Sequence, residues 1–127
     1  KKDIALEMGV DFRSLSNAYN YGIIPRPMTL AKIADYFNVP IDYLLGRSEN
    51  DYFVKGKAND SFYDRYTALR DELKVTDYQI AASLHFDRTL CYKWKSKGHI
   101  PTLEVIDLLC EYFDVSADYL LGRTDVK

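Results

Sequence analysis

The spacing of apolar residues predicts short amphipathic helices along the chain. Phe62, Tyr66, Leu69 and Leu73 follow one another at intervals of four, three and four residues, which places them in one stripe along a helix. We expect this helix over residues 62–74. Four residues of types that cap helices are expected to open the helices that follow it: Thr76, Asp87, Thr102 and Ser116. The fold class predicted from this pattern is all-α.

The chain also contains an internal repeat. A shift of 76 residues without gaps aligns residues 4–47 with residues 80–123, and fifteen of these positions are identical. The run Asp-Tyr-Leu-Leu-Gly-Arg stands intact in both copies, at 42–47 and at 118–123. Identities at turns and apolar positions indicate that one helical design was duplicated. The counterpart of the 62–74 helix would fall before residue 1, so the first copy lacks its opening helix.

We therefore expect two tandem domains joined by a linker. The first domain covers residues 1–49, the linker 50–60 and the second, complete domain 61–127. The linker mixes Asn, Asp, Gly and Lys with a few aromatic residues. In each domain the second and third helices are joined by a turn of about three residues, the helix-turn-helix geometry in which the later helix can enter the major groove of DNA.

Composition narrows the classes of function. Apolar residues make up 47% of the chain, too many for a disordered protein. No apolar run approaches the roughly 20 residues of a membrane-spanning helix, and no signal peptide opens the sequence, so we expect a cytoplasmic protein without membrane contact. Cys91 and Cys110 lack the spacing of a metal site, and we expect both to be reduced, buried thiols.

Catalysis is the least favoured class. The two His and two Cys residues form no nucleophile–base arrangement, and no glycine-rich phosphate loop or cluster of metal ligands is present in the sequence. We predict that the protein is not an enzyme and that it needs neither a cofactor nor a metal.

The two copies resemble the phage-repressor/Cro-like (XRE) helix-turn-helix family. The resemblance lies in the turn between the second and third helices, in Trp94 followed seven residues later by Pro101, and in the closing pattern Tyr-Phe-x-Val-x-x-Asp-Tyr-Leu-Leu-Gly. Each copy shows the resemblance, and the two copies together cover nearly the whole chain. It implies five-helix, lambda-repressor-like domains that bind a double-stranded DNA operator, usually as a homodimer, and so regulate transcription as a repressor does.

The resemblance and the charge pattern imply a set of DNA-contacting residues in the second copy: Arg88, Thr89, Lys93, Lys95 and Lys97. Residues 88–97 hold four cations and no acid, although the chain has a net charge of −2. Arginine can pair with guanine and threonine can touch a thymine methyl group, whereas the last two lysines suit phosphate contacts. Asp77, at the start of the second helix, would repel phosphate unless its side chain turns away.

The corresponding residues of the first copy are Phe12, Arg13, Asn17 and Asn20. Arg13 is the only cation of this helix, and Asn17 can pair with adenine. Tyr19 and Tyr21 of the same helix equally suit a protein contact surface. The alternative function is therefore a protein-interaction or dimerisation module that retains the fold, with DNA read by only one copy or by neither.

Overall fold

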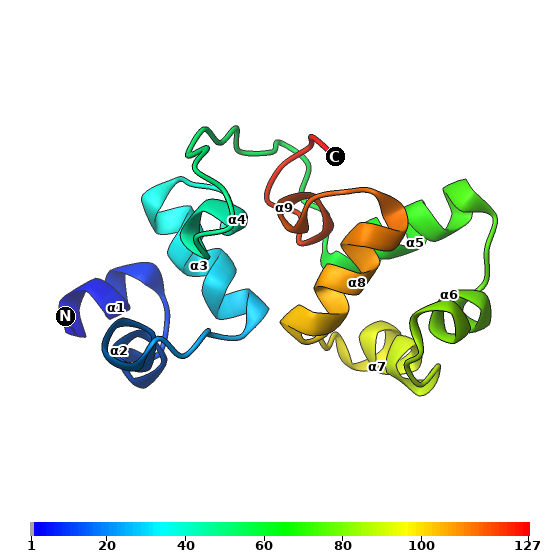
Figure 1. The fold of residues 1–127 in the computed structure, drawn as a ribbon, viewed down its shortest axis with the longest axis horizontal. Coiled ribbons are helices and arrows are strands. Elements are labelled where there is room, and N and C mark those ends of the chain that lie inside the picture. The colour runs from blue at the N-terminus through cyan, green and yellow to red at the C-terminus, as the bar shows by residue number, and fades with distance from the viewer. Residues whose placement is uncertain (1) are drawn as a thin grey trace. The chain divides into compact units, whose positions relative to one another are not determined.

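The computed structural model describes residues 2–127, and its secondary structure over that range consists of helices without strands (Figure 1). The prediction of an all-α fold is confirmed. The chain divides into two compact units, the first ending at Val54 and the second covering Lys55–Lys127. No helix within the described range is long and apolar enough to cross a membrane.

The described part of the first unit contains α1 (Lys2–Met8), α2 (Phe12–Tyr21), α3 (Pro27–Phe37) and α4 (Ile41–Leu44). Pro27 stands in the first turn of α3, where a missing N–H group costs no hydrogen bond. The middle of α3 is buried and forms much of the core of this unit. Near the end of α3, the Tyr36 hydroxyl donates to Oε2 of Glu7 in α1 at 2.9 Å.

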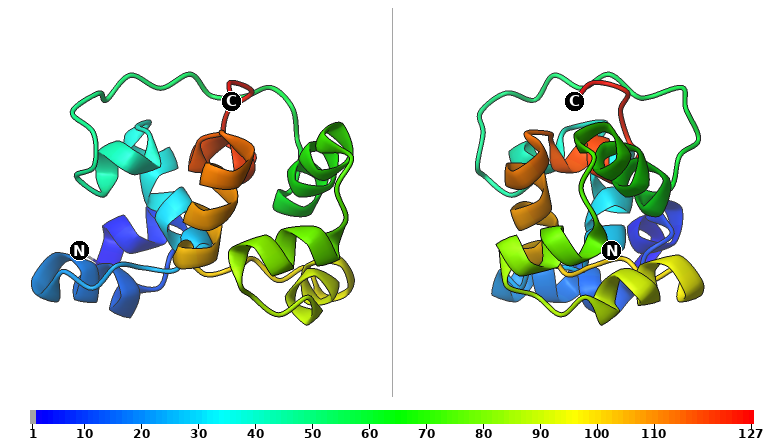
Figure 2. Two further views of the ribbon diagram at one scale, coloured as in Figure 1. Left: turned by 45° about the vertical axis from the view of Figure 1, so that its right-hand side comes forward. Right: turned by 90° about the vertical axis from the view of Figure 1, so that its right-hand side faces the viewer.

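The second unit contains α5 (Phe62–Leu73), α6 (Asp77–Leu84), α7 (Thr89–Lys97), α8 (Leu103–Phe113) and α9 (Ala117–Leu120). In Figures 1 and 2, α6 and α7 lie together at one end of this unit and α9 lies at the other. Ser61 and Asp64 form a capping box at the start of α5, with bonds of 3.2 and 3.0 Å. Lys74 ends α5 in a left-handed conformation, so the helix is one residue shorter than predicted.

The helices of the two units begin and end at equivalent positions. Shifted by 76 residues, α3 and α4 coincide with α8 and α9, and α1 and α2 match α6 and α7 to within one residue at each end. The left-handed residues that end these helices agree as well, with φ of 66° at Gly22 and 64° at Gly98, and 55° at Asn38 and 57° at Asp114. Among the described residues of the first unit, α5 has no counterpart.

An aromatic cluster between α5 and α7 forms the core of the second unit. The Trp94 ring stands edge-on to Phe62 at 5.3 Å and to Tyr66 at 5.2 Å between ring centroids. Tyr66 meets Phe113 of α8 in the same way at 6.2 Å. Each such contact contributes about 0.5–1.5 kcal/mol beyond the burial of apolar surface. The cluster therefore fixes how α7 lies against α5.

A hydrogen-bonded group ties α5 to the start of α6. The Tyr66 hydroxyl donates to Oδ1 of Asp77 at 2.7 Å, and Nη1 of Arg70 donates to the same oxygen at 3.1 Å. Burial, and then the bond to Asp77, raise the pKa of Tyr66 well above its ordinary value, so the phenol keeps its proton and remains a donor. The group leaves Asp77 paired with a cation of its own unit.

Both cysteines are free thiols. Cys91 is buried beside the Tyr66 hydroxyl, at 3.6 Å, and burial raises the pKa of its thiol. Cys110 is only half-buried, so the expectation that both thiols lie in the core is correct for Cys91 alone.

Arg65 of α5 is buried, and each of its three guanidinium nitrogens donates a hydrogen bond. Its Nε donates to Asp60 at 3.0 Å, its Nη2 to Asp125 at 3.2 Å and its Nη1 to the carbonyl of Thr124 at 3.1 Å. The guanidinium also lies 4.2 Å from the centroid of the Tyr119 ring in α9. One side chain thus joins the start of the second unit to its end.

The Asp125 carboxylate extends this connection to the residues before α5. It accepts the backbone N–H of Lys57 at 2.8 Å and that of Ala58 at 3.4 Å, and the N–H of Gly56 donates to the carbonyl of Arg123 at 2.9 Å. The segment expected to be a linker over 50–60 is therefore not uniform, because residues 56–58 are bonded to the second unit.

We predict that Tyr66→Phe lowers the free energy of unfolding of the second unit by about 1 kcal/mol, because the phenol loses its bond to Asp77 while the ring stays. Trp94 is the only tryptophan, so its fluorescence during urea denaturation reports on this unit. Tyr63→Phe on the same helix is the matched control and should leave the midpoint unchanged. An equal loss in both variants would contradict the assigned role of the Tyr66 hydroxyl.

We also predict that Asp125 contributes to the loss of stability of the second unit in acid. The backbone N–H of Lys57 first, then Ala58 and Arg65, hold the pKa of Asp125 below its ordinary value of 3.8. The folded pKa is the lower one, so this stabilisation is complete above pH 3.8 and is lost as the pH falls through the folded value. Asp125→Asn should be less stable than the parent at neutral pH, and the gap should narrow in acid. Parallel stability curves between pH 7 and 2 would refute this.

Candidate nucleic-acid interface

The candidate interface is built on α6, the turn after it, and α7. Thr76 and Gln79 cap α6 reciprocally, with the Gln79 N–H donating to Thr76 Oγ1 at 3.1 Å and the Thr76 N–H donating to Gln79 Oε1 at 2.9 Å. The helix ends at His85, which has a φ of 61°. A left-handed residue reverses the chain tightly here, and the first unit has Gly9 with a φ of 72° at the equivalent place.

Asp87 starts α7. Its carboxylate accepts the backbone N–H of Thr89 at 2.9 Å, and this bond holds the pKa of Asp87 below its ordinary value. Arg88 already has helical backbone angles but precedes the first residue of α7, so the helix begins one residue later than predicted. Gly98, with a φ of 64°, ends it.

One side of α7 is committed to the core. Cys91 and Trp94 are 3% and 2% exposed, and Trp94 packs on Phe62 and Tyr66 as described above. The structure leaves all five predicted DNA-contacting residues of this unit exposed: Arg88, Thr89, Lys93, Lys95 and Lys97.

The four cations lie at the two edges of the exposed arc of α7. With 3.6 residues per turn, Arg88 and Lys95 fall on one edge, and Lys93 and Lys97 on the other. A helix laid in a groove presents its edges to the flanking phosphates. The arrangement therefore places positive charge where two phosphate backbones would pass.

The centre of the arc is uncharged and includes two residues that the sequence analysis missed. Thr89 shares it with Tyr92, which is 67% exposed, and with Ser96, whose hydroxyl donates to the carbonyl of Tyr92 at 2.8 Å. The signal for both was present in the sequence, because the period of residues 88–97 places them on the side opposite Cys91 and Trp94.

The start of α6 adds a second exposed aromatic residue. Tyr78 is 63% exposed, and the Arg88 guanidinium lies 5.7 Å from the centroid of its ring. Asp77 beside it is turned toward Arg70 and Tyr66. The charge of Asp77 is therefore paired within the unit.

The first unit has a similar pair of helices with a different surface. Asp11 caps α2 by accepting the N–H of Ser14 at 3.2 Å, whereas the equivalent Asp87 stands before the N-cap of α7 and accepts the N–H of Thr89. No residue of α2 is fully buried, whereas α7 buries two. Tyr19 and Tyr21 of α2 are 74% and 75% exposed at the positions that Lys95 and Lys97 hold in α7.

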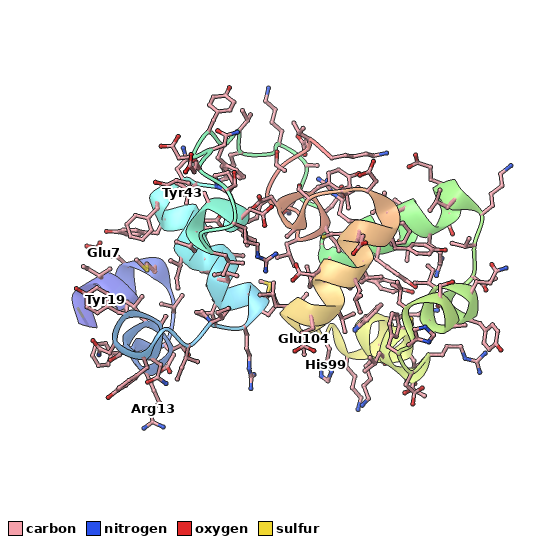
Figure 3. The ribbon with its side chains drawn as sticks, in the orientation of Figure 1. Glu7, Arg13, Tyr19, Tyr43, His99 and Glu104 are labelled. Carbon is pink, nitrogen blue, oxygen red and sulfur yellow. The ribbon has the colours of Figure 1, made fainter. Side chains whose placement is uncertain are left out.

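The four predicted contact residues of the first unit have different surroundings. Phe12 lines an apolar pocket with residues of α1 and α3. Arg13 is exposed and extends away from the helices (Figure 3). Asn17 is half-buried, and the amide of Asn20 donates to Ser16 Oγ at 3.0 Å. Only Arg13 offers a positive charge on this helix.

No group of three or more His, Cys, Asp or Glu side chains in the described part of the chain is arranged to hold a metal ion.

Comparison with known proteins agrees with this geometry for the second unit. Residues 68–120 match the model of a protein family described as helix-turn-helix, a range that begins within α5 and ends with α9. No curated protein and no solved structure matches the chain. The matched part of the second unit is therefore similar to helix-turn-helix domains of the XRE type, which are found in DNA-binding regulators.

Proposed function

We propose that the protein is a transcriptional regulator of the repressor type, and that α7 of its second unit reads operator DNA in the major groove. The observation that carries this proposal is the surface of α7, on which four cations flank an uncharged, exposed arc. A helix-turn-helix places such a helix along the groove. Phosphate contacts by the flanking cations supply most of the affinity, and the arc supplies specificity.

The residues divide accordingly. Thr89, Tyr92 and Ser96 face the base edges, where hydroxyl groups and an aromatic ring can meet both hydrogen-bonding groups and thymine methyl groups. Arg88, at the entry of α7, suits a bidentate bond to guanine. Lys95 and Lys97 suit the phosphates, and Lys93 stands where it can reach either.

We propose further that the first unit is a second helix-turn-helix copy, so that the chain is a tandem protein. The coincidence of helix bounds and left-handed residues after a shift of 76 supports this. Arg13 and Asn17 would then make the base contacts of the first unit, with Asn20 near phosphate. We place the protein in the cytoplasm. If both copies bind one operator, or if two chains bind it as a homodimer, the half-sites should lie about 34 Å apart or a multiple of that distance.

A second candidate function rests on the aromatic surface of α2. The exposed Tyr19 and Tyr21 replace the two lysines of α7, and tyrosine is enriched in protein interfaces. The first unit would in that case bind a protein partner while the second unit reads DNA. Salt distinguishes the two roles, because DNA binding through lysine and arginine weakens steeply with ionic strength and protein binding through tyrosine does not.

We predict that Arg88→Ala and Lys93→Ala each weaken binding to a selected operator by about tenfold or more, since each removes a base or phosphate contact. Losing a phosphate contact should also reduce the slope of log affinity against log salt by about 0.9. Fluorescence anisotropy at several salt concentrations measures both quantities. Lys55→Ala is the matched control, because it removes the same charge from an exposed position away from α7. If neither variant differs from this control, α7 is not the reading helix.

We predict a smaller effect from the first unit. Arg13→Ala should weaken operator binding less than Arg88→Ala, because α2 has one cation where the corresponding stretch of the second unit has four. Selection of bound sequences from random DNA checks this independently. A single selected half-site that is insensitive to Arg13→Ala would assign the first unit to the protein-contact role.

A further inference from the structure

The starts of α6 and α7 bring an aromatic ring and a cation together at the surface of the second unit. Tyr78 is the second residue of α6, and Arg88 immediately precedes α7. The central carbon of the Arg88 guanidinium lies 5.7 Å from the centroid of the Tyr78 ring, within the range of a cation–π interaction. Both side chains are exposed. The pair therefore adds a ring to the edge of the candidate interface.

The backbone that carries the Tyr78 ring is fixed on both sides. Thr76 and Gln79 form the capping box around it, with bonds of 3.1 and 2.9 Å. Asp77, the residue before it, is bonded to two side chains of α5 at 2.7 and 3.1 Å. Asp77 thus turns into the unit, and Tyr78, about 100° further round the helix, stays outside. Because α5 also anchors α7 through Trp94, one helix holds both members of the pair in place.

Arg88 is positioned by its backbone and not by an acid. Its φ and ψ are −55° and −26°, and its carbonyl accepts the N–H of Cys91 at 3.0 Å. The neighbouring Asp87 carboxylate is bonded to the N–H of Thr89 instead. Among the described residues, no group accepts a hydrogen bond from the Arg88 guanidinium or forms a salt bridge with it. The ring of Tyr78 is therefore the group that orients this guanidinium.

A ring and a carboxylate hold a guanidinium in different ways. A carboxylate accepts its N–H groups, which point outward in the plane of the guanidinium. An aromatic ring contacts the face of the guanidinium and leaves those N–H groups unused. A bidentate bond to O6 and N7 of guanine needs two of them. The Tyr78 ring can thus orient Arg88 without competing with a base for its donors.

The pair is a feature of the second unit alone. The counterparts of Tyr78 and Arg88 in the first unit are Lys2 and Phe12, so the first unit has no arginine at the equivalent place. Phe12 lines an apolar pocket. The two units therefore differ at the entry of the later helix as well as along its outer side.

We propose that Tyr78 is a positioning residue that holds Arg88 for the reading of guanine in the operator. An arginine side chain that rotates freely loses this freedom when it binds, and the loss weakens binding. A guanidinium already stacked on a ring loses less, so the bidentate bond contributes more to the affinity. The advantage applies to a base that needs the guanidinium in one orientation, so it favours guanine over the other bases. The inference rests on the proposed function of α7 and assigns a role to a residue outside that helix.

The test first assigns the base that Arg88 reads. Sequences bound by the parent and by Arg88→Ala are selected from random DNA, and the position whose preference disappears in the variant belongs to Arg88. We expect guanine at this position. Binding is then measured by fluorescence anisotropy on duplexes that differ only at this base pair.

Tyr78→Ala should weaken binding to the guanine duplex by about two- to fivefold, the range expected for an exposed cation–π contact. The ratio of the affinities for guanine and adenine at this position should fall as well. Tyr78→Phe keeps the ring, so it should keep the affinity and the ratio of the parent. In the Arg88→Ala background, Tyr78→Ala should have no further effect, because the two changes remove one interaction.

The matched control is Tyr52→Ala, which removes a tyrosine that is 73% exposed from a position outside α6 and α7. It should bind every duplex as the parent does. The urea midpoint reported by Trp94 fluorescence should be the same in the parent and in Tyr78→Ala, because the ring that is removed is 63% exposed. The loss of affinity then comes from the contact with Arg88 and not from a loss of folding.

Several results would overturn the proposal. Tyr78→Ala could weaken all duplexes equally, or weaken the Arg88→Ala protein by the same factor, and the ring would then act on DNA or on the fold without Arg88. An equal loss in Tyr78→Phe would assign the effect to the hydroxyl group. If Tyr78→Ala binds like the parent while Arg88→Ala does not, the positioning role is wrong and α7 remains the reading helix. If Arg88→Ala itself binds like the parent, the proposed function of α7 fails, and the inference fails with it.

Discussion

The edge-on packing of Trp94 against Phe62 and Tyr66 is the contact on which the second unit depends. A helix of nine residues such as α7 is not stable in water on its own, so it exists because tertiary packing holds it. The same contact turns one side of α7 toward α5 and leaves the other side to solvent. The exposure of the α7 residues in the candidate interface follows from that orientation. A unit of this size can present a precise surface on a short helix only by anchoring its opposite side in this way.

The two units show how much of the surface the fold leaves undetermined. Their helices start and stop at equivalent residues to within one position, and left-handed residues end equivalent helices in both units. Yet three of the four cations flanking α7 are replaced in α2 by aromatic side chains, namely Phe12, Tyr19 and Tyr21. Turn glycines, capping residues and the apolar period set the backbone, and none of these occupies the outer side of the helix. Two units with closely similar backbones can therefore present different surfaces.

Sequence alone predicted most of the helical framework, because its signals are local. The caps at Thr76, Thr102 and Ser116 form as predicted. The N-cap of α7 is Arg88 rather than Asp87, although the Asp87 carboxylate still accepts the backbone N–H of Thr89. The exposure of the predicted residues on α7 followed from the helical period in the same way. What sequence did not predict depends on contacts between distant residues. The turn of Asp77 toward Arg70 and Tyr66, and the binding of residues 56–58 to Asp125, need partners that the chain brings together only when folded. Tyr92 and Ser96 were missed for another reason. Both are uncharged, so the charge pattern of residues 88–97 does not indicate them.

The cations in residues 88–97 have a consequence for any polyanion that approaches the protein. Arg88, Lys93, Lys95 and Lys97 together carry +4 in a chain whose total is −2, so all other residues sum to −6. A polyanion is repelled by most of such a molecule and attracted by one strip of it. Collisions in the wrong orientation are then rejected at a distance of about a Debye length, roughly 8–10 Å at moderate salt, before any contact is made. An acidic protein with one basic helix is therefore oriented by the electric field during its approach. It also binds polyanions non-specifically less strongly than a protein with a uniformly basic surface would.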